Sequence, residues 1–101
     1  MKNEAKVKFL EEYLPEAYPD AVLIGEEKER KHYYPAIMGF DSNSERVIYD
    51  REKLISCFME YNNWSYEDAS EWVSYNVDRS LPYMGSHAPI IMDDITTVFE
   101  E

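Results

Sequence analysis

Residue types with the chemistry for covalent catalysis are few and scattered in this chain of 101 residues. The one cysteine, Cys57, falls inside an apolar helical pattern, so we expect a core residue and not a nucleophile. Ser86 and His87 are adjacent, and neighbouring side chains of an extended segment point to opposite sides. The chain holds no G-x-S-x-G elbow and no glycine-rich phosphate loop. The sequence therefore predicts no catalytic residue and no cofactor.

Oxygen-bearing side chains occur in two spacings that imitate functional sites. Asp41, Asn43 and Glu45 follow the start of a calcium loop, but Arg46 stands where that loop needs glycine. A hairpin turn explains these residues better, so we predict no metal site. A second spacing, four residues apart on one helix face, belongs to Glu67 and Glu71, yet no oxyanion-binding group lies near them in the sequence. We therefore expect a chain that is not an enzyme.

The charge of the chain is strongly negative and unevenly distributed. Lys and Arg number 10 against 21 Asp and Glu, a formal net charge of −11, which argues against direct binding to nucleic acid. Residues 65–101 carry eight carboxylates and one cation, a net charge of −7. Such a surface either keeps a small protein monodisperse or docks on a basic partner. For the second interpretation we expect the contacts to be Glu67, Asp68, Glu71, Asp78, Asp93 and Asp94.

A tyrosine-rich corner is the most distinctive stretch of the last third. Tyr75, Asn76, Arg79 and Tyr83 lie where a predicted helix ends. One interpretation is structural: Asn76 ends the helix and Arg79 binds nearby carbonyls or a carboxylate. The alternative is a partner-facing hot spot, because Tyr and Arg dominate protein interfaces.

Length and composition predict one domain over residues 1–101. Hydrophobic residues make up 45% of the chain, which is too many for a disordered chain of this charge. No apolar run approaches the roughly 20 residues of a membrane span, and the N-terminus runs directly into a charged helical pattern. A single cysteine suits a reducing compartment. We therefore expect a cytoplasmic protein that does not contact membranes.

The first half of the chain predicts a helix followed by a hairpin. Apolar spacing favours a helix over residues 4–14, ending at Pro15. Residues 21–24 fit either a short strand or a turn of helix. Strands over residues 34–40 and 46–49 are separated by five turn-forming residues, which is typical of a β-hairpin.

The second half predicts two helices and a last strand. Asp50 and Ser65 are placed to cap helices that begin directly after them. An apolar run over residues 88–92 reads as a strand with Pro89 at its start, and residues 95–101 as a frayed tail. The order α-β-β-α-α-β indicates an α+β fold, with a small three-stranded, mainly antiparallel sheet and about three helices packed on one face.

A recognisable pattern extends over residues 36–92. It consists of Ala36, Ile37, Gly39, Arg46, Val47, Tyr49, Asp50, Glu67, Ala69, Glu71, Trp72, Tyr75, Asn76, Arg79, Leu81, Pro82, Tyr83, Gly85, Ala88, Pro89, Ile90 and Ile91. With these residues, the stretch resembles a group of short acidic proteins of unknown function found in bacteria, phages and prophages. The resemblance implies a family-like core over 36–92, a variable helix and loop over 1–35 and an acidic tail over 93–101. It implies a mobile-element setting and no reaction.

Charge, size and resemblance together favour a phage- or prophage-type accessory protein. We expect it to bind a host or defence protein with a basic surface in the bacterial cytoplasm, with an anti-CRISPR inhibitor that competes with nucleic acid as the most concrete form. The alternative is a small regulatory or structural module that acts through Tyr75, Arg79 and Tyr83, including as a homodimer through an edge strand.

Overall fold

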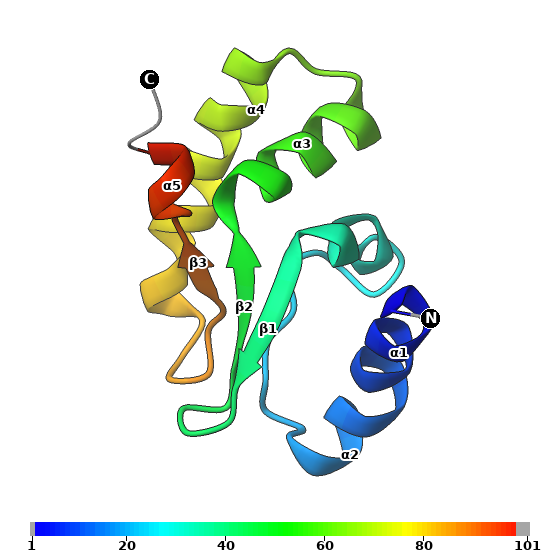
Figure 1. The fold of residues 1–101 in the computed structure, drawn as a ribbon. Helices are drawn as coiled ribbons and strands as arrows, with labels where there is room; N and C mark the ends of the chain where they lie inside the picture. The colour runs from blue at the N-terminus through cyan, green and yellow to red at the C-terminus, as the bar shows by residue number, and fades with distance from the viewer. Residues whose placement is uncertain (1, 99–101) are drawn as a thin grey trace.

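Residues 2–17 form one helical segment beside the sheet. The computed structural model describes residues 2–98, beginning with α1 (Lys2–Lys8), the π-helical turn η1 (Phe9–Tyr13) and α2 (Leu14–Ala17) (Figure 1). The predicted end at Pro15 is wrong, because the helix continues to Ala17. The Leu14 N–H donates to the carbonyl of Phe9 across the π-turn, so Pro15 falls in the first turn of α2, where a missing N–H costs little.

The segment between α2 and the sheet is mostly irregular. Residues 21–24 form neither of the two structures considered for them, and the Val22 N–H donates to the His87 carbonyl over 3.3 Å. A 3₁₀-helix, η2 (Arg30–Ala36), then leads into β1 (Ile37–Asp41). The predicted start of the strand at residue 34 is wrong, because the chain around Pro35 continues the 3₁₀-helix.

The predicted hairpin is confirmed. Strand β1 pairs antiparallel with β2 (Arg46–Asp50). The Asp41 carboxylate accepts hydrogen bonds from the Asn43 N–H at 3.1 Å and the Ser44 hydroxyl at 2.8 Å, which stabilises the turn.

Four helical segments follow β2, and both predicted caps are present. The Lys53 N–H donates to Asp50 over 2.9 Å, and the Asp68 N–H donates to the Ser65 hydroxyl over 3.1 Å. Asn63, in the left-handed conformation with φ of 58°, separates the first two helices. The segments are α3 (Arg51–Asn62), α4 (Tyr66–Trp72), the π-helical turn η3 (Val73–Val77) and the 3₁₀-helix η4 (Asp78–Tyr83).

The sheet is mixed, with the order β1-β2-β3. Strand β3 (Ile90–Met92) runs parallel to β2, so the expectation of a mainly antiparallel sheet is wrong in this detail. The reason is the long helical connection over residues 51–89, which returns the chain to the end of the sheet where β2 began. A short helix, α5 (Ile95–Val98), lies in the predicted frayed tail, and residues 99–101 are outside the described part.

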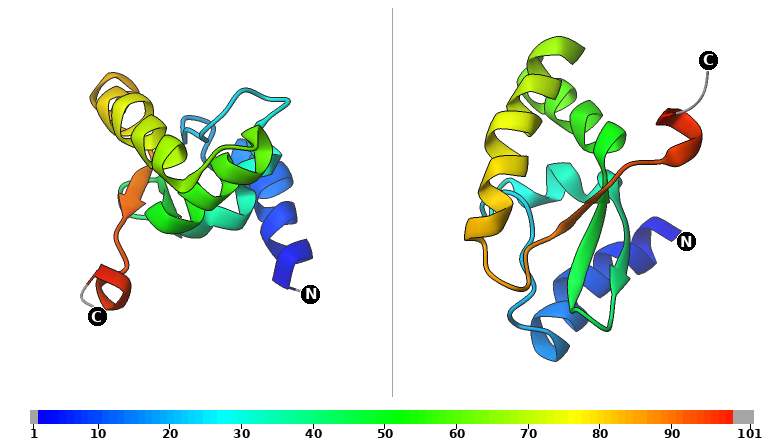
Figure 2. Two further views of the ribbon diagram at one scale, coloured as in Figure 1. Left: turned by 90° about the horizontal axis from the view of Figure 1, so that it is seen from above. Right: turned by 90° about the vertical axis from the view of Figure 1, so that its left-hand side faces the viewer.

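Helices cover one face of the sheet, and the α+β class with three strands is confirmed. Val47 and Tyr49 of β2 have no exposed surface, whereas Ile48 between them is only half-buried and its partner Gly39 is exposed. One apolar cluster joins Leu10 of η1 to the sheet and to helices α3 and α4. Figure 2 shows α4 and α5 on different sides of the strands.

None of the helices within residues 2–98 combines the length and the apolar character that crossing a membrane requires.

Candidate functional site

The six carboxylates predicted to contact a partner fall into two sets with different environments. Glu67, Asp68 and Glu71 lie on α4, and all three side chains are exposed. Among the described residues, no Lys, Arg or His lies within ion-pair distance of any of them. The N-terminal end of a helix favours the negative charges of its first turn, but Glu67 and Glu71, four residues apart, repel each other.

Asp78 and Asp93 are bound to the arginine that begins α3. The Arg51 guanidinium places Nη1 2.7 Å from Asp78 Oδ2 and Nε 2.7 Å from Asp93 Oδ1. Burial opposes the charged form of Arg51, but the hydrogen bonds to both carboxylates raise its pKa above the ordinary value. These two predicted contacts therefore hold η4 and the segment after β3 against α3.

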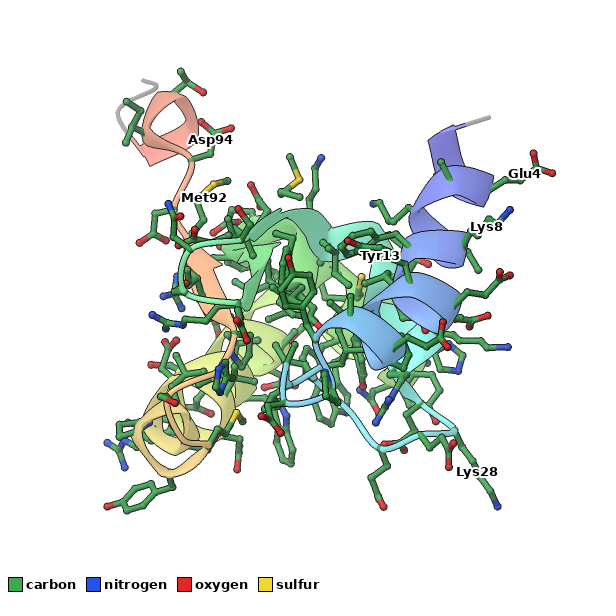
Figure 3. All side chains as sticks on the ribbon, turned by 90° about the horizontal axis from the view of Figure 1, so that it is seen from below. Glu4, Lys8, Tyr13, Lys28, Met92 and Asp94 are labelled. Carbon is green, nitrogen blue, oxygen red and sulfur yellow. The ribbon has the colours of Figure 1, made fainter. Side chains whose placement is uncertain are left out.

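Asp94 lies apart from the α4 carboxylates, at the start of α5. Its carboxylate accepts a hydrogen bond from the Thr96 N–H over 2.9 Å and another from the Thr96 hydroxyl. Figure 3 shows Asp94 and Met92 on the opposite side of the molecule from Lys28. Because α4 and α5 lie on different sides of the strands (Figure 2), and Asp78 and Asp93 are bound to Arg51, the predicted acidic residues do not form one continuous surface.

The predicted tyrosine corner is open to solvent. The Arg79 guanidinium lies over the Tyr75 ring, with Cζ 4.4 Å from the centroid, which is a cation–π contact. Asn76 donates to the Trp72 carbonyl over 3.2 Å. Tyr83, at the end of η4, is 89% exposed. A side chain this exposed contributes little to the core, so Tyr83 is available for contact with a partner.

One hollow with an aromatic lining was not anticipated from the sequence. It has a volume of about 500 Å³ and lies between the 23–29 loop and the helices α3, α4, η3 and η4. Five aromatic rings from four segments of the chain line it, and we call it the aromatic groove. These rings belong to Tyr33, Phe58, Tyr61, Trp64 and Trp72. The high aromatic content was the only sign of this groove in the sequence, and it did not indicate which residues would line it.

A glycine and a buried tyrosine place the loop that forms one wall of the aromatic groove. Gly25 has φ of +95°, and a Cβ at this position would lie 2.9 Å from the Tyr33 ring. The Ile24 N–H donates over 2.9 Å to the hydroxyl of Tyr49, which has no exposed surface. Because burial desolvates its phenol, the pKa of Tyr49 is raised far above the ordinary value.

Carboxylates make the aromatic groove negative. Glu26 and Glu29 are part of the lining, and no Lys or Arg is. The Tyr61 hydroxyl donates to Glu29 over 3.4 Å. Burial, followed by the charge of Glu29, raises the pKa of Tyr33 to about 12, and the same two causes raise the pKa of Tyr61. Both phenols therefore stay protonated beside the carboxylate.

A second hollow, of about 300 Å³, adjoins the aromatic groove on the α4 side. Trp64 and Trp72 line both hollows, and their ring centroids are 5.4 Å apart. We call it the acidic hollow, because predicted contact residues Asp68 and Glu71 line it together with Tyr75. The structure therefore brings three of the predicted residues together around tryptophans that no site prediction included.

Ser86 and His87 correct one argument from the sequence. Their side chains meet, with Oγ 3.3 Å from Nδ1, and His87 Nε2 lies 3.4 Å from Glu45 Oε1. This order of hydroxyl, imidazole and carboxylate resembles a hydrolytic triad, but the hollows described above have other linings. Catalysis also needs a bound substrate and oxyanion donors, so the contact alone does not define an active site.

Cys57 is buried, as expected for a core residue, and burial raises the pKa of its thiol, which disfavours the reactive thiolate. Within residues 2–98, no three His, Cys, Asp or Glu side chains are grouped so that they could hold a metal ion.

The chain matches no family model, no curated protein and no solved structure. The resemblance to short acidic phage and prophage proteins therefore stays a prediction.

Proposed function

We propose that this chain is a binding protein that docks on a basic surface of another protein through the outer face of α4. One observation carries the proposal: Glu67, Asp68 and Glu71 are exposed, and no described cation pairs with them. Exposed Trp72 and Tyr75 lie on the same helical segment. Aromatic anchors beside uncompensated charge are the chemistry of a protein interface, where charge steers the encounter and rings contribute contact area.

The sequence resemblance suggests the setting of this proposal. A phage- or prophage-type accessory protein acts in the bacterial cytoplasm on a host or defence protein. If the basic surface is one that normally holds nucleic acid, the carboxylates replace phosphates, and the protein acts as an anti-CRISPR inhibitor or a related nucleic-acid mimic. No reaction is part of this function.

Reversal of charge tests the proposal. The tagged chain is used to capture partners from a bacterial lysate, and the captured protein is then purified for titration. We expect the triple variant E67K/D68K/E71K to lose about 100-fold in affinity, because three attractive pairs become repulsive. We also expect the affinity of the unchanged chain to fall with added salt, and a DNA duplex to displace it if the partner's surface holds nucleic acid.

A matched control distinguishes the effect of the α4 carboxylates from the effect of the chain's net charge. The variant E12K/E16K/E60K changes the net charge equally at exposed positions outside the aromatic groove and the acidic hollow. It should keep its affinity within about 3-fold. Equal losses in both variants would reject the α4 face, and a partner without a basic surface would reject the whole proposal.

The second candidate function uses Tyr75, Arg79 and Tyr83, and the 89% exposure of Tyr83 favours it. In this function the chain is a small protein-interaction module, and one form of it is a homodimer. Light scattering over a range of concentrations distinguishes the two: a dimer that Tyr83→Ser dissociates supports this candidate, and a monomer at every concentration excludes its homodimeric form.

A further inference from the structure

The aromatic groove has a lining that suits one kind of occupant. Its rings come from η2, α3, the α3–α4 connection and α4, and two of them are well exposed, Tyr61 at 40% and Trp72 at 42%. The volume of about 500 Å³ lies within the range of ligand-binding hollows. Exposed aromatic surface around a hollow of this size is what apolar side chains of a ligand can cover.

The charges around the aromatic groove select among apolar ligands. Glu26 and Glu29 belong to its lining, and Asp68 and Glu71 lie in the acidic hollow on the other side of the tryptophans. Among the described residues, no Lys or Arg lines either hollow. Lys28, in the same loop as Glu26 and Glu29, points away from the rest of the molecule in Figure 3. An anionic ligand is therefore repelled, and a cationic one is attracted from both sides.

Aromatic rings and carboxylates together recognise a cation with an apolar stem. A guanidinium or ammonium group binds the face of an indole ring, and its charge is complemented by nearby carboxylates. The long aliphatic stems of Arg and Lys cover apolar surface while the charged head stays near water or an anion.

We propose that the aromatic groove holds a partner segment in which an Arg or Lys is flanked by apolar residues. The proposal rests on the proposed function, because it names what the chain recognises on its basic partner. The cationic side chain lies between the rings of Trp64 and Trp72 and the carboxylates of Glu26 and Glu29, and the flanking apolar side chains cover the exposed ring of Tyr61. The α4 face then supplies the wider electrostatic attraction around this anchor.

Intrinsic fluorescence reads this site directly, because the chain has only two tryptophans and both line the aromatic groove. The probe is the peptide acetyl-Gly-Leu-Arg-Leu-Gly-amide, titrated to about 5 mM, which detects a millimolar complex. We expect a saturable change in tryptophan emission. The matched peptides replace Arg by Glu, or both Leu by Ser, and each should bind at least about 5-fold more weakly.

Paired variants test the location. E26Q/E29Q removes two charges from the lining, and Gln can still accept the hydrogen bond of Tyr61. It should weaken the arginine peptide about 5-fold. E12Q/E16Q removes two exposed charges that line neither hollow and should change the affinity by less than about 2-fold. The variant Trp72→Leu keeps an apolar side chain at this position and leaves Trp64 as the fluorescent reporter. It should bind the original arginine peptide with less preference over the peptide in which Glu replaces Arg.

Three outcomes would overturn the inference: no saturable change with the arginine peptide, equal binding of the glutamate peptide, or equal effects of E26Q/E29Q and E12Q/E16Q. These outcomes are separate from the test of the α4 face. A partner that E67K/D68K/E71K loses and E26Q/E29Q retains would support the proposed function and reject the groove as its anchor. If the peptide binds in the groove but no basic partner is found, the groove inference would be supported and the proposed function rejected.

Discussion

The carboxylates near the two ends of helix α3 differ in whether a cation of the chain binds them. At its N-terminal end, Asp50 accepts the Lys53 N–H and Arg51 binds two carboxylates at 2.7 Å. At its C-terminal end, the chain turns at Asn63 into a region of exposed rings and carboxylates, in which no described cation pairs with the α4 acids.

The difference separates charges that hold the fold from charges that are available for binding. An ion pair inside the molecule restricts its partners and adds a modest stabilisation, whereas like charges left together on a surface repel and destabilise slightly. Function offers a reason to keep the second arrangement, because a basic partner relieves the repulsion on binding. The variants below test the loop that forms one wall of the aromatic groove and then compare the two sets of charges.

The largest expected effect is at Gly25, in the wall of the aromatic groove. Gly25→Ala places a Cβ 2.9 Å from the buried Tyr33 ring and forces a residue with a side chain to φ of +95°. We expect a loss of about 2–3 kcal/mol in the free energy of unfolding, measured by urea denaturation. Gly85→Ala is the control: its φ is +91°, but the space around it is open, so only the backbone strain of about 1 kcal/mol should appear. Equal losses would mean that the contact with Tyr33 does not position the loop.

Tyr49→Phe tests the second attachment of the same loop. The substitution keeps the buried ring but leaves the Ile24 N–H without its acceptor, and a buried donor without a partner costs about 1–3 kcal/mol. We expect a loss of about 2 kcal/mol and a shift in tryptophan emission as the groove wall loosens. Tyr66→Phe removes an exposed hydroxyl that binds Glu52 at 2.9 and 3.1 Å, and should cost less than about 0.5 kcal/mol. A similar cost for both variants would contradict the role of Tyr49.

Local signals in the sequence predicted the parts of this structure that local chemistry determines. Asp50 and Ser65 cap their helices, and Asp41 organises the hairpin turn, because each acts on a backbone N–H two or three residues away. The end of the first helix was misplaced because the π-turn before Pro15 is a change of helical register that side-chain spacing does not reveal.

The aromatic groove could not be predicted because its parts are distant in the sequence. Tyr33 and Trp72 line the same groove although they are 39 positions apart, because the tertiary fold brings η2 and α4 to the same hollow. The direction of β3 has the same cause, since the path of the 51–89 connection decides it. The predicted acidic set was divided for a related reason: nothing near Asp78 or Asp93 in the sequence indicates that Arg51 binds both.

A smaller effect separates the two sets of acids directly. D78N/D93N and E67Q/E71Q each remove two negative charges. The first weakens both ion pairs of Arg51 and should lower the free energy of unfolding by about 1 kcal/mol in low salt and by less in high salt. The second relieves the repulsion between two helix residues four apart and should change stability by no more than about 0.5 kcal/mol. Denaturation of both variants at two salt concentrations measures the difference, and the opposite ranking would remove the distinction between the two sets.

The smallest effect is a dependence on alkaline pH at the groove end of α3. The pKa of Tyr33 is about 12 in the folded chain, while an unfolded tyrosine has a pKa of about 10. The folded state therefore keeps a proton that the unfolded state releases, so the contribution of Tyr33 is complete below about pH 10 and is lost as the pH rises towards 12. Other tyrosines with raised pKa values lower the stability in the same range, so the informative quantity is the difference between variants.

From about pH 9 to pH 11.5, Tyr33→Phe should lose less stability than the unchanged chain, and Tyr83→Phe, at the 89% exposed position, should follow the unchanged chain. Parallel curves for Tyr33→Phe and the unchanged chain would show that burial and the charge of Glu29 do not raise the pKa of Tyr33 in the folded chain, and would remove this evidence for a negative environment beside the ring.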